Sequence, residues 1–352
     1  MGATEAVTPA LEGEHATRSR SVLGRLVSGR GGISSLAVVA LVVFAITAGA
    51  PLAARIVGHG PNDPLPYAVD ASLKPVAPFS RVSASTSAVV DEETYELAQP
   101  PAGTPTTLLV FGAADVLGRD LFLRILYGGR VSLIVAIGGA LLAGLIGVLL
   151  GTLAGYMGGW IDAVISRLTE LAMAFPLLLL LILLGNIDNP LDAITLGVLE
   201  PGVMTLIVLI GLFTWFYPAR LVRTQVRSLQ QREFVEAAEM IGASRIRIIR
   251  THLLPHVLPE LLVYGTLMVA TNITLEAGMT FLNAGIALPT ASWGTLLSSA
   301  WGTALAPSPS GAPSFQPWTT ALPIAAIFVT VLSLSRLGEL LGDAVGARTH
   351  FR

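Results

Sequence analysis

Residues 233–259 read EFVEAAEMIGASRIRIIRTHLLPHVLP, a charged segment between two apolar stretches of the chain. Apolar positions recur in it at helical spacing as far as Gly242, resume after the glycine, and are interrupted by Pro255. A glycine after the last helical turn and a proline beyond it are common signals for the end of a helix. The pattern predicts a helix, a glycine turn and a second short helix that stops at Pro255. Such a hairpin suits docking into a partner's groove.

The composition is that of an integral membrane protein. Of the 352 residues, 53% are hydrophobic and only 12% are charged, whereas soluble domains carry roughly 25% charged residues. The chain contains no cysteine, which excludes disulfides, cysteine-ligated metal centres and thiol catalysis. The net charge of −2 conceals a strong local asymmetry between acidic and basic segments.

This asymmetry predicts the orientation of the chain in the membrane. Four arginines lie between residues 18 and 30, before the first apolar run, and seven arginines against three glutamates lie between Arg220 and Arg250. Residues 57–117 instead carry seven acids against Lys74 and Arg81. Because basic residues gather in cytoplasmic loops, we expect cytoplasmic termini and an extracytoplasmic 57–117 segment.

Apolar runs long enough to cross a bilayer predict six spans, at residues 33–56, 131–161, 162–184, 203–220, 258–282 and 317–341.

The first span also ends in the triplet Ala48-Gly49-Ala50, which is typical of a signal-peptide cleavage site. Pro51 directly after the triplet and the length of the apolar run favour an uncleaved anchor instead. Residues 1–32 are polar and predict a mobile cytoplasmic tail. Within residues 57–117 we expect irregular backbone with short strands at 88–90 and 107–111.

Two further patterns predict how the membrane helices are arranged. Residues 118–130 place apolar side chains at helical spacing and keep three arginines apart from them, which predicts an amphipathic helix on the membrane surface. Small residues then recur every four positions and predict a close approach between helices. Pro176 predicts a kink in the third span. The small residues are Gly139, Ala143, Gly147, Gly151 and Gly155.

Ionisable residues at membrane depth are functional hypotheses by default. Arg167 and Glu170 lie three residues apart and share a helix face, so they form either a structural ion pair or part of a substrate path or gate. Glu276 has no evident partner in the sequence. Two interpretations of Glu276 remain open: it takes part in gating or in contact between subunits, or it is a partly hydrated acid at the membrane surface.

Catalytic and metal-binding patterns are missing from the sequence. His252 and His256 have a spacing that can present two metal ligands, but Pro255 separates them and a third ligand is absent. The zincin, nucleophile-elbow and phosphate-loop motifs do not occur, so the chain itself does not hydrolyse ATP in the phosphate-loop manner. A secondary transporter or channel would need paired helix breaks and acids near the midplane, and the sequence offers one break, at Pro176. The sequence also lacks the recognisable nucleophile and base that an intramembrane hydrolase would need.

Several motifs in order resemble the second permease subunit of dipeptide, oligopeptide and nickel ABC importers, over residues 111–343. The chain departs from the family's G-T-D-x-x-G-R-D pattern with two alanines at residues 113–114, and its 57–117 segment and proline-rich 305–317 loop are longer than usual. The matching motifs are GRDLFLRILYGGRVSL at 118–133, GYMGGWID at 155–162, ARLVR at 219–223, EFVEAAEMIGAS at 233–244, HLLP at 252–255 and FLNAGIALPTASWG at 281–294.

The resemblance implies an all-α membrane protein with six transmembrane helices of the type I importer permease fold. Its core would occupy residues 118–345, with a coupling loop at 224–257 and a cytoplasmic tail at 346–352. It implies a bacterial inner-membrane subunit that binds no cofactor or nucleic acid and works with a homologous permease, two ATPases that hold ATP and Mg, an extracytoplasmic substrate-binding protein and a peptide. The ATPase-docking residues it implies are Glu233, Glu236, Ala237, Ala238, Gly242, Ala243, Ser244, Leu254 and Pro255.

Overall fold

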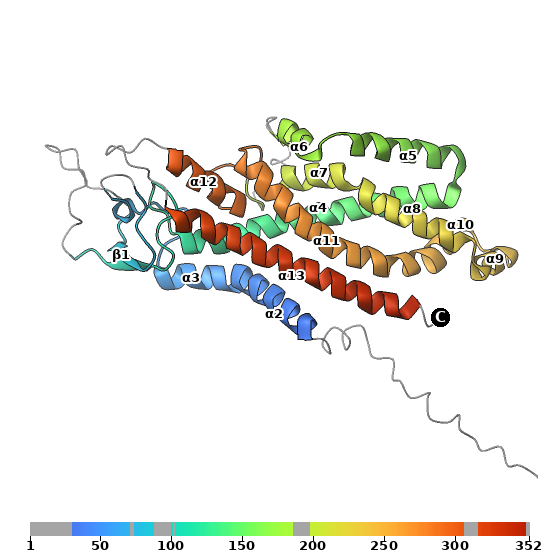
Figure 1. Ribbon diagram of the computed structural model, residues 1–352, viewed down its shortest axis with the longest axis horizontal. Helices are drawn as coiled ribbons and strands as arrows, with labels where there is room; N and C mark the ends of the chain where they lie inside the picture. Colours follow the sequence, from blue (N-terminus) through green and yellow to red (C-terminus); the bar gives the residue numbers. More distant parts are fainter. Residues whose placement is uncertain are drawn as a thin grey trace, which may run out of the picture.

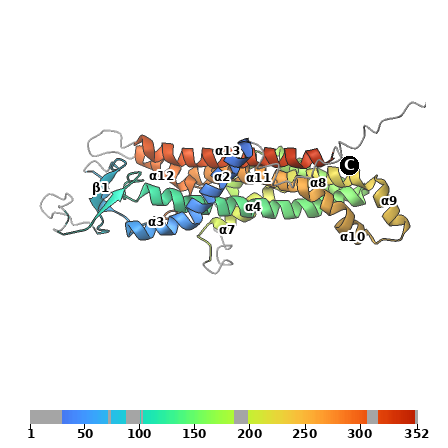
Figure 2. The ribbon, with the colours of Figure 1, turned by 90° about the horizontal axis from the view of Figure 1, so that it is seen from below.

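The computed structural model describes residues 30–70, 74–87, 100, 103–185, 198–305 and 316–349. The molecule is elongated, and its longest helices run nearly along its long axis (Figure 1). A small two-stranded sheet lies at one end, which we name the sheet end, and the short helices α9 and α10 lie at the other, which we name the hairpin end (Figures 1 and 2). The sequence-based expectations for residues 1–29, 88–90, 350–352 and most of the 305–317 loop fall outside the described residues.

The described chain is built almost entirely from helices. The labels η1 and η4 denote π-helical turns inside longer helical stretches, and η2 is a 3-10 turn. In order, the elements are α2 (Arg30–Phe44), η1 (Ala45–Gly49), α3 (Ala50–Val57), η2 (Pro66–Ala68), β1 (Ser80–Ser83), β2 (Thr106–Leu109), α4 (Leu121–Met157), α5 (Gly159–Ala174), α6 (Leu177–Gly185), α7 (Val203–Thr214), α8 (Phe216–Gln230), α9 (Glu233–Met240), α10 (Arg245–Ile248), η4 (Ile249–Leu253), α11 (Leu254–Phe281), α12 (Trp293–Leu305) and α13 (Pro317–Thr349).

The chain is a polytopic membrane protein. Four helices are long and apolar enough to cross a bilayer, and the number rises to six if each of two bent helix pairs forms one span. The pair α5 and α6 is bent by 83° at the predicted Pro176 break, because a proline cannot continue the helical hydrogen bonds. The pair α7 and α8 is bent by 42° at Trp215. This second break was not predicted from the sequence.

The helix predicted at residues 118–130 is not a separate element, because the structure has one continuous helix from Leu121 to Met157. The Asp120 side chain caps its first turn by accepting from the backbone N–H of Phe122 at 2.8 Å and of Leu123 at 3.2 Å. Arg124, expected on the surface, is fully buried. Its Nη1 donates to Asn62 Oδ1 at 2.9 Å and to the carbonyl oxygens of Pro61 and Pro289, each at 3.3 Å.

Glycines in α4 bring its backbone against that of α8. A methyl group added to Gly151 would lie 2.5 Å from the carbonyl oxygen of Ala219, and one added to Gly155 would lie 2.8 Å from that of Arg223. Gly147 similarly packs on Pro218. The predicted close helix approach is therefore confirmed, and its partner is α8.

The described part of residues 57–117 folds as a small unit at the sheet end. Strands β1 and β2 pair antiparallel, with Ser80 opposite Leu109 and Ser83 opposite Thr106. Strand β2 overlaps the predicted strand at 107–111 but begins and ends earlier. The buried core of the unit consists of Leu65, Ala68, Val82, Leu109 and Ala113.

Helix α12 was not predicted, since its 13 residues are too short for a span. Trp293 fixes its start against α4, because its Nε1 donates to the Ile125 carbonyl at 3.1 Å and its backbone N–H donates to Ser132 Oγ at 3.2 Å. The last helix, α13, then runs from the sheet end toward the hairpin end (Figure 1).

Alanine at Gly151 and at Gly144 should have opposite effects on stability. Gly151→Ala forces α4 and α8 apart and should cost about 1–3 kcal/mol, as overpacking usually does. Gly144 has no atom within 4 Å of an added methyl group, so Gly144→Ala should stabilise the helix by up to about 1 kcal/mol. Thermal unfolding of the purified variants in detergent measures both effects. A shift of the same sign in both would contradict the packing.

Candidate functional site

The hairpin formed by α9 and α10 extends beyond the ends of the long helices (Figure 2). The turn between the two helices depends on Gly242, whose φ of +79° favours glycine. The N–H of Gly242 donates to the Glu239 carbonyl at 2.9 Å, and that of Ala243 donates to the Ala238 carbonyl at 3.0 Å. These two bonds form a Schellman motif. The predicted helix, glycine turn and second short helix are therefore confirmed.

The inner face of the hairpin has its own apolar core. Val235 and Ala238 of α9 pack with Ile248 of α10 and with Val222 and Val226 of α8. Leu253 and Val257, where α11 begins, complete the cluster. Ala238 is therefore buried within the chain, whereas the neighbouring predicted docking residue Ala237 is exposed. This core joins α9 and α10 to α8 and to the beginning of α11.

The outer face of the hairpin mixes charged and apolar residues. Met240, Ile241 and Ile246 are 82%, 85% and 77% exposed, and sequence analysis did not single them out. Apolar residues beside the turn glycine are the signal that could have identified them, since large apolar side chains at the tip of a projecting turn suggest an interaction surface. Of the predicted docking residues, Glu233, Glu236, Gly242, Ser244 and Pro255 are also exposed, and Ala243 and Leu254 are half-buried.

Pro255 does not end the second half of the hairpin, so that part of the prediction is wrong. The chain passes through the π-helical turn η4 into α11, and Pro255 lies in the first turn of α11. The hairpin is consequently continuous with a long membrane helix.

The two histidines brace the hairpin. The ring of Phe234 in α9 stacks on His256, with ring centroids 5.4 Å apart and planes inclined by 18°. His256 Nδ1 lies 2.7 Å from the carbonyl oxygen of His252. Within the described residues there is no group of three or more histidine or acidic side chains that could hold a metal ion.

An ion pair that sequence analysis missed connects α5 with α8. Both Nε and Nη2 of Arg223 donate to the Asp162 carboxylate, the latter at 2.7 Å, and Arg227 Nη1 lies 3.4 Å from the same carboxylate. Asp162 and Arg223 are 61 residues apart in the chain, which no local pattern reveals. Because α8 leads directly into the hairpin, this contact links the hairpin to α5.

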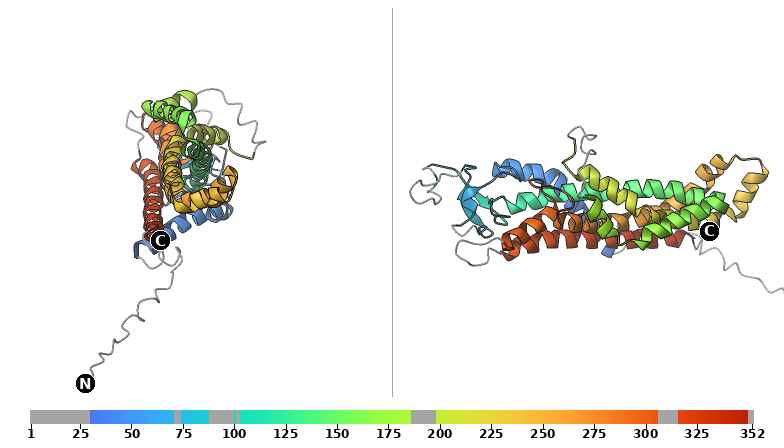
Figure 3. Two further views of the ribbon diagram at one scale, coloured as in Figure 1. Left: turned by 90° about the vertical axis from the view of Figure 1, so that its right-hand side faces the viewer. Right: turned by 90° about the horizontal axis from the view of Figure 1, so that it is seen from above.

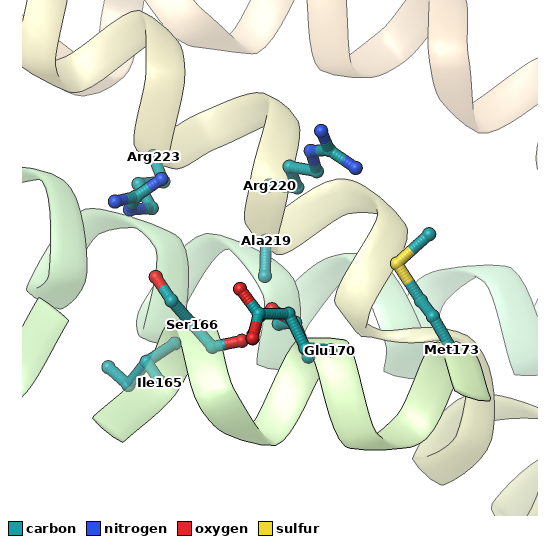
Figure 4. A pocket seen from close by; sticks show the side chains of 8 residues that line it. Ile165, Ser166, Glu170, Met173, Ala219, Arg220 and Arg223 are labelled. Carbon is teal, nitrogen blue, oxygen red and sulfur yellow. The ribbon is translucent and has the colours of Figure 1, made fainter. Parts of the chain in front are cut away.

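A cavity of about 270 Å³ lies between α5 and α8 (Figure 4). Arg167 and Glu170 of α5 form the predicted ion pair, with Nη1 and Oε2 2.6 Å apart, and their side chains are 81% and 62% exposed. Glu170 also lines the cavity. The complete lining consists of Ile165, Ser166, Thr169, Glu170, Met173, Ala219, Arg220 and Arg223.

Glu276 lies apart from this cavity, in the half of α11 nearer α12. Its side chain is 0% exposed, and its Oε1 accepts from Thr280 Oγ1 at 3.2 Å. The interpretation of a partly hydrated surface acid is therefore wrong. A role for Glu276 in gating stays a prediction.

Comparison with known proteins identifies a family and several relatives. The family model described as "Binding-protein-dependent transport system inner membrane component" matches residues 147–350. The oligopeptide transport system permease protein OppC of Salmonella typhimurium is 38% identical over 233 residues, which are 66% of this chain and 70% of the relative. OppC of Bacillus subtilis is 33% identical over 269 residues, 76% of this chain and 78% of the relative. A solved structure of the inward-facing MetNI methionine ABC transporter aligns with 63% of this chain and 95% of its own, at 18% identity and a TM-score of 0.45.

Removing the charge of Asp162 should destabilise the chain far more than removing that of Glu339. Asp162 is only 14% exposed and accepts from Arg223 through two nitrogens, so Asp162→Asn should cost about 1.5–3 kcal/mol. Glu339 pairs with Arg336 at 3.5 Å, with both side chains more than 60% exposed, so Glu339→Gln should cost about 0–1 kcal/mol. Thermal unfolding in detergent compares the two variants. Equal losses would contradict a structural role for the Asp162 contact.

Proposed function

Because this chain belongs to the family of binding-protein-dependent transport system inner membrane components, we propose that it is a permease subunit of an ATP-driven importer of di- or oligopeptides. The observation that carries the proposal is the similarity to OppC proteins over two thirds or more of their length. The family model also spans the hairpin and the α5–α8 cavity. An importer of nickel or another small solute is the alternative within the family, and a secondary transporter or channel is the alternative outside it.

The proposed mechanism is alternating access driven from the hairpin. Two partner ATPases bind ATP and Mg and close on the nucleotide, which draws the hairpins of this chain and of a homologous permease together. The apolar core under α9 passes this movement to α8 and α11, and the Asp162–Arg223 contact carries it to α5. The chain performs no chemical step itself and needs no cofactor or nucleic acid.

The charges suggest how the chain is oriented in the bacterial cytoplasmic membrane. The arginines from Arg220 to Arg250 gather toward the hairpin end, and the described part of residues 57–117, which includes Asp63, Asp70 and Asp115, lies at the sheet end. By the preference of basic residues for the cytoplasmic side, the hairpin and both termini would lie in the cytoplasm, with the ATPases. The sheet end would then face the extracytoplasmic binding protein.

A charge at the tip of the hairpin should uncouple the transporter. Ile241→Glu replaces an apolar side chain on the docking face, so we expect loss of ATPase co-purification and of peptide uptake in the reconstituted complex. Glu236→Arg, which reverses a charge on the same face, should have the same effect. Val198→Glu is the matched control, because Val198 is equally exposed, at 84% against 85% for Ile241, but lies outside the hairpin. Normal ATPase binding by Ile241→Glu would contradict the docking role.

Uptake assays distinguish the proposed substrate from its alternatives. Proteoliposomes that contain this chain, the homologous permease and the ATPases, supplied with the binding protein, should accumulate labelled peptide only in the presence of ATP. Accumulation of nickel in place of peptide would support the alternative within the family. Transport by the chain alone under an ion gradient would instead support a secondary transporter.

A further inference from the structure

The cavity between α5 and α8 carries charged groups of both signs. Arg220 and Arg223 project from α8 on either side of Ala219, and Glu170 and Ser166 extend from α5 opposite them (Figure 4). Ile165 and Met173 supply apolar lining. Seen end-on, α5 lies at the edge of the bundle (Figure 3).

These charged groups differ in how firmly they are held. Arg223 is engaged by Asp162 through two nitrogens. The guanidinium of Arg220 has no hydrogen bond or ion pair within the part of the chain that the structure describes, although its backbone carbonyl accepts from Thr224 Oγ1 at 2.9 Å. An unengaged guanidinium offers a planar fork of N–H donors that matches a carboxylate.

Glu170 is available for a second contact. Its present partner, Arg167, is 81% exposed, and an exposed pair of this kind contributes about 0–1 kcal/mol. A ligand ammonium group can therefore replace Arg167 at the Glu170 carboxylate at little cost. The cavity thus combines an acceptor for a cation with a donor for an anion.

We propose that this cavity is a contact site for a zwitterionic peptide, in which Arg220 binds the terminal carboxylate and Glu170 binds the terminal ammonium group. The proposal rests on the proposed function of a peptide importer. The volume of the cavity, about 270 Å³, is just below the roughly 300–1,000 Å³ of ordinary ligand sites. A cavity of this size suits a dipeptide or one end of a longer peptide. Met173 provides an adaptable apolar surface for varied side chains.

A lipid headgroup is the other occupant to consider, since arginines near a membrane surface attract anionic lipids. The carboxylate of Glu170 in the lining disfavours a phosphate, because like charges repel at short range. A peptide satisfies both walls of the cavity, whereas an anionic lipid satisfies only the α8 wall. The charges therefore favour a zwitterion over an anionic lipid, and the proposed peptide substrate favours a peptide over a zwitterionic headgroup.

The absence of cysteine from the chain permits a direct test of occupancy. Thr169→Cys places a single thiol of this chain in the cavity lining, and Leu168→Cys places one on a neighbouring exposed position outside the lining. In the full complex without binding protein, we expect a dipeptide with free termini to slow maleimide labelling of the Thr169→Cys variant several-fold and that of the Leu168→Cys variant not at all. The C-terminally amidated dipeptide should protect the thiol at position 169 much less. In the Arg220→Gln background, the difference between the free and the amidated dipeptide should disappear.

Specific results would overturn the proposal. Absence of protection by the dipeptide, equal protection by its amide, or protection by phosphatidylglycerol or phosphatidylethanolamine vesicles in place of peptide would each do so.

ATP-driven peptide uptake by the same complex separates this failure from that of the proposed function. If uptake persists while the thiol at position 169 is unprotected, only the cavity assignment is wrong. If no peptide is taken up under any condition, the proposed function itself is wrong. A melting midpoint of Arg220→Gln within the range of the parent chain excludes misfolding as the cause.

Discussion

The close contact between α4 and α8 is the constraint on which the rest of the structure depends. In lipid, apolar surface gives no driving force for helices to associate, so close van der Waals packing and short backbone distances must hold them together. Gly147, Gly151 and Gly155 allow this because their missing side chains let α8 lie directly on the α4 backbone. Any side chain at these positions would displace α8, and α8 carries both the hairpin and one wall of the cavity.

The hairpin is held in place by its packing on α8. Its inner apolar side chains pack on α8 and on the beginning of α11, so α9 cannot move independently of two membrane helices. The stacked rings of Phe234 and His256 add a contact on another side. The hairpin thus combines an exposed apolar tip with a base packed on two longer helices, which is the arrangement that the proposed docking role requires.

Local sequence patterns predicted those features that local chemistry determines. Gly242 ends α9 because a left-handed backbone favours glycine, Pro176 breaks a helix because it lacks an N–H, and the four-residue repeat of small side chains marks a contact face. Features that depend on distant partners were missed or misinterpreted. Arg124 resembled a surface residue because its acceptors, at Pro61, Asn62 and Pro289, lie 62 or more residues away in the chain. The Asp162–Arg223 contact was not predicted for the same reason, since its two residues are 61 positions apart in the chain.

The bend at Trp215 bears on the alternative of a secondary transporter. That alternative was disfavoured in part because the sequence offered one helix break, whereas the structure contains two bent pairs. The breaks alone do not favour it, because a carrier driven by an ion gradient also needs acids at the break that can bind the coupling ion. Here Asp162 is held by Arg223, Glu170 is exposed and pairs with Arg167, and Glu276 is buried in contact with Thr280, so the described bends do not bring a pair of free acids together. The residues that line the cavity between α5 and α8 lie close in the chain to the two bends, and the charged lining suits a zwitterion better than a bare cation.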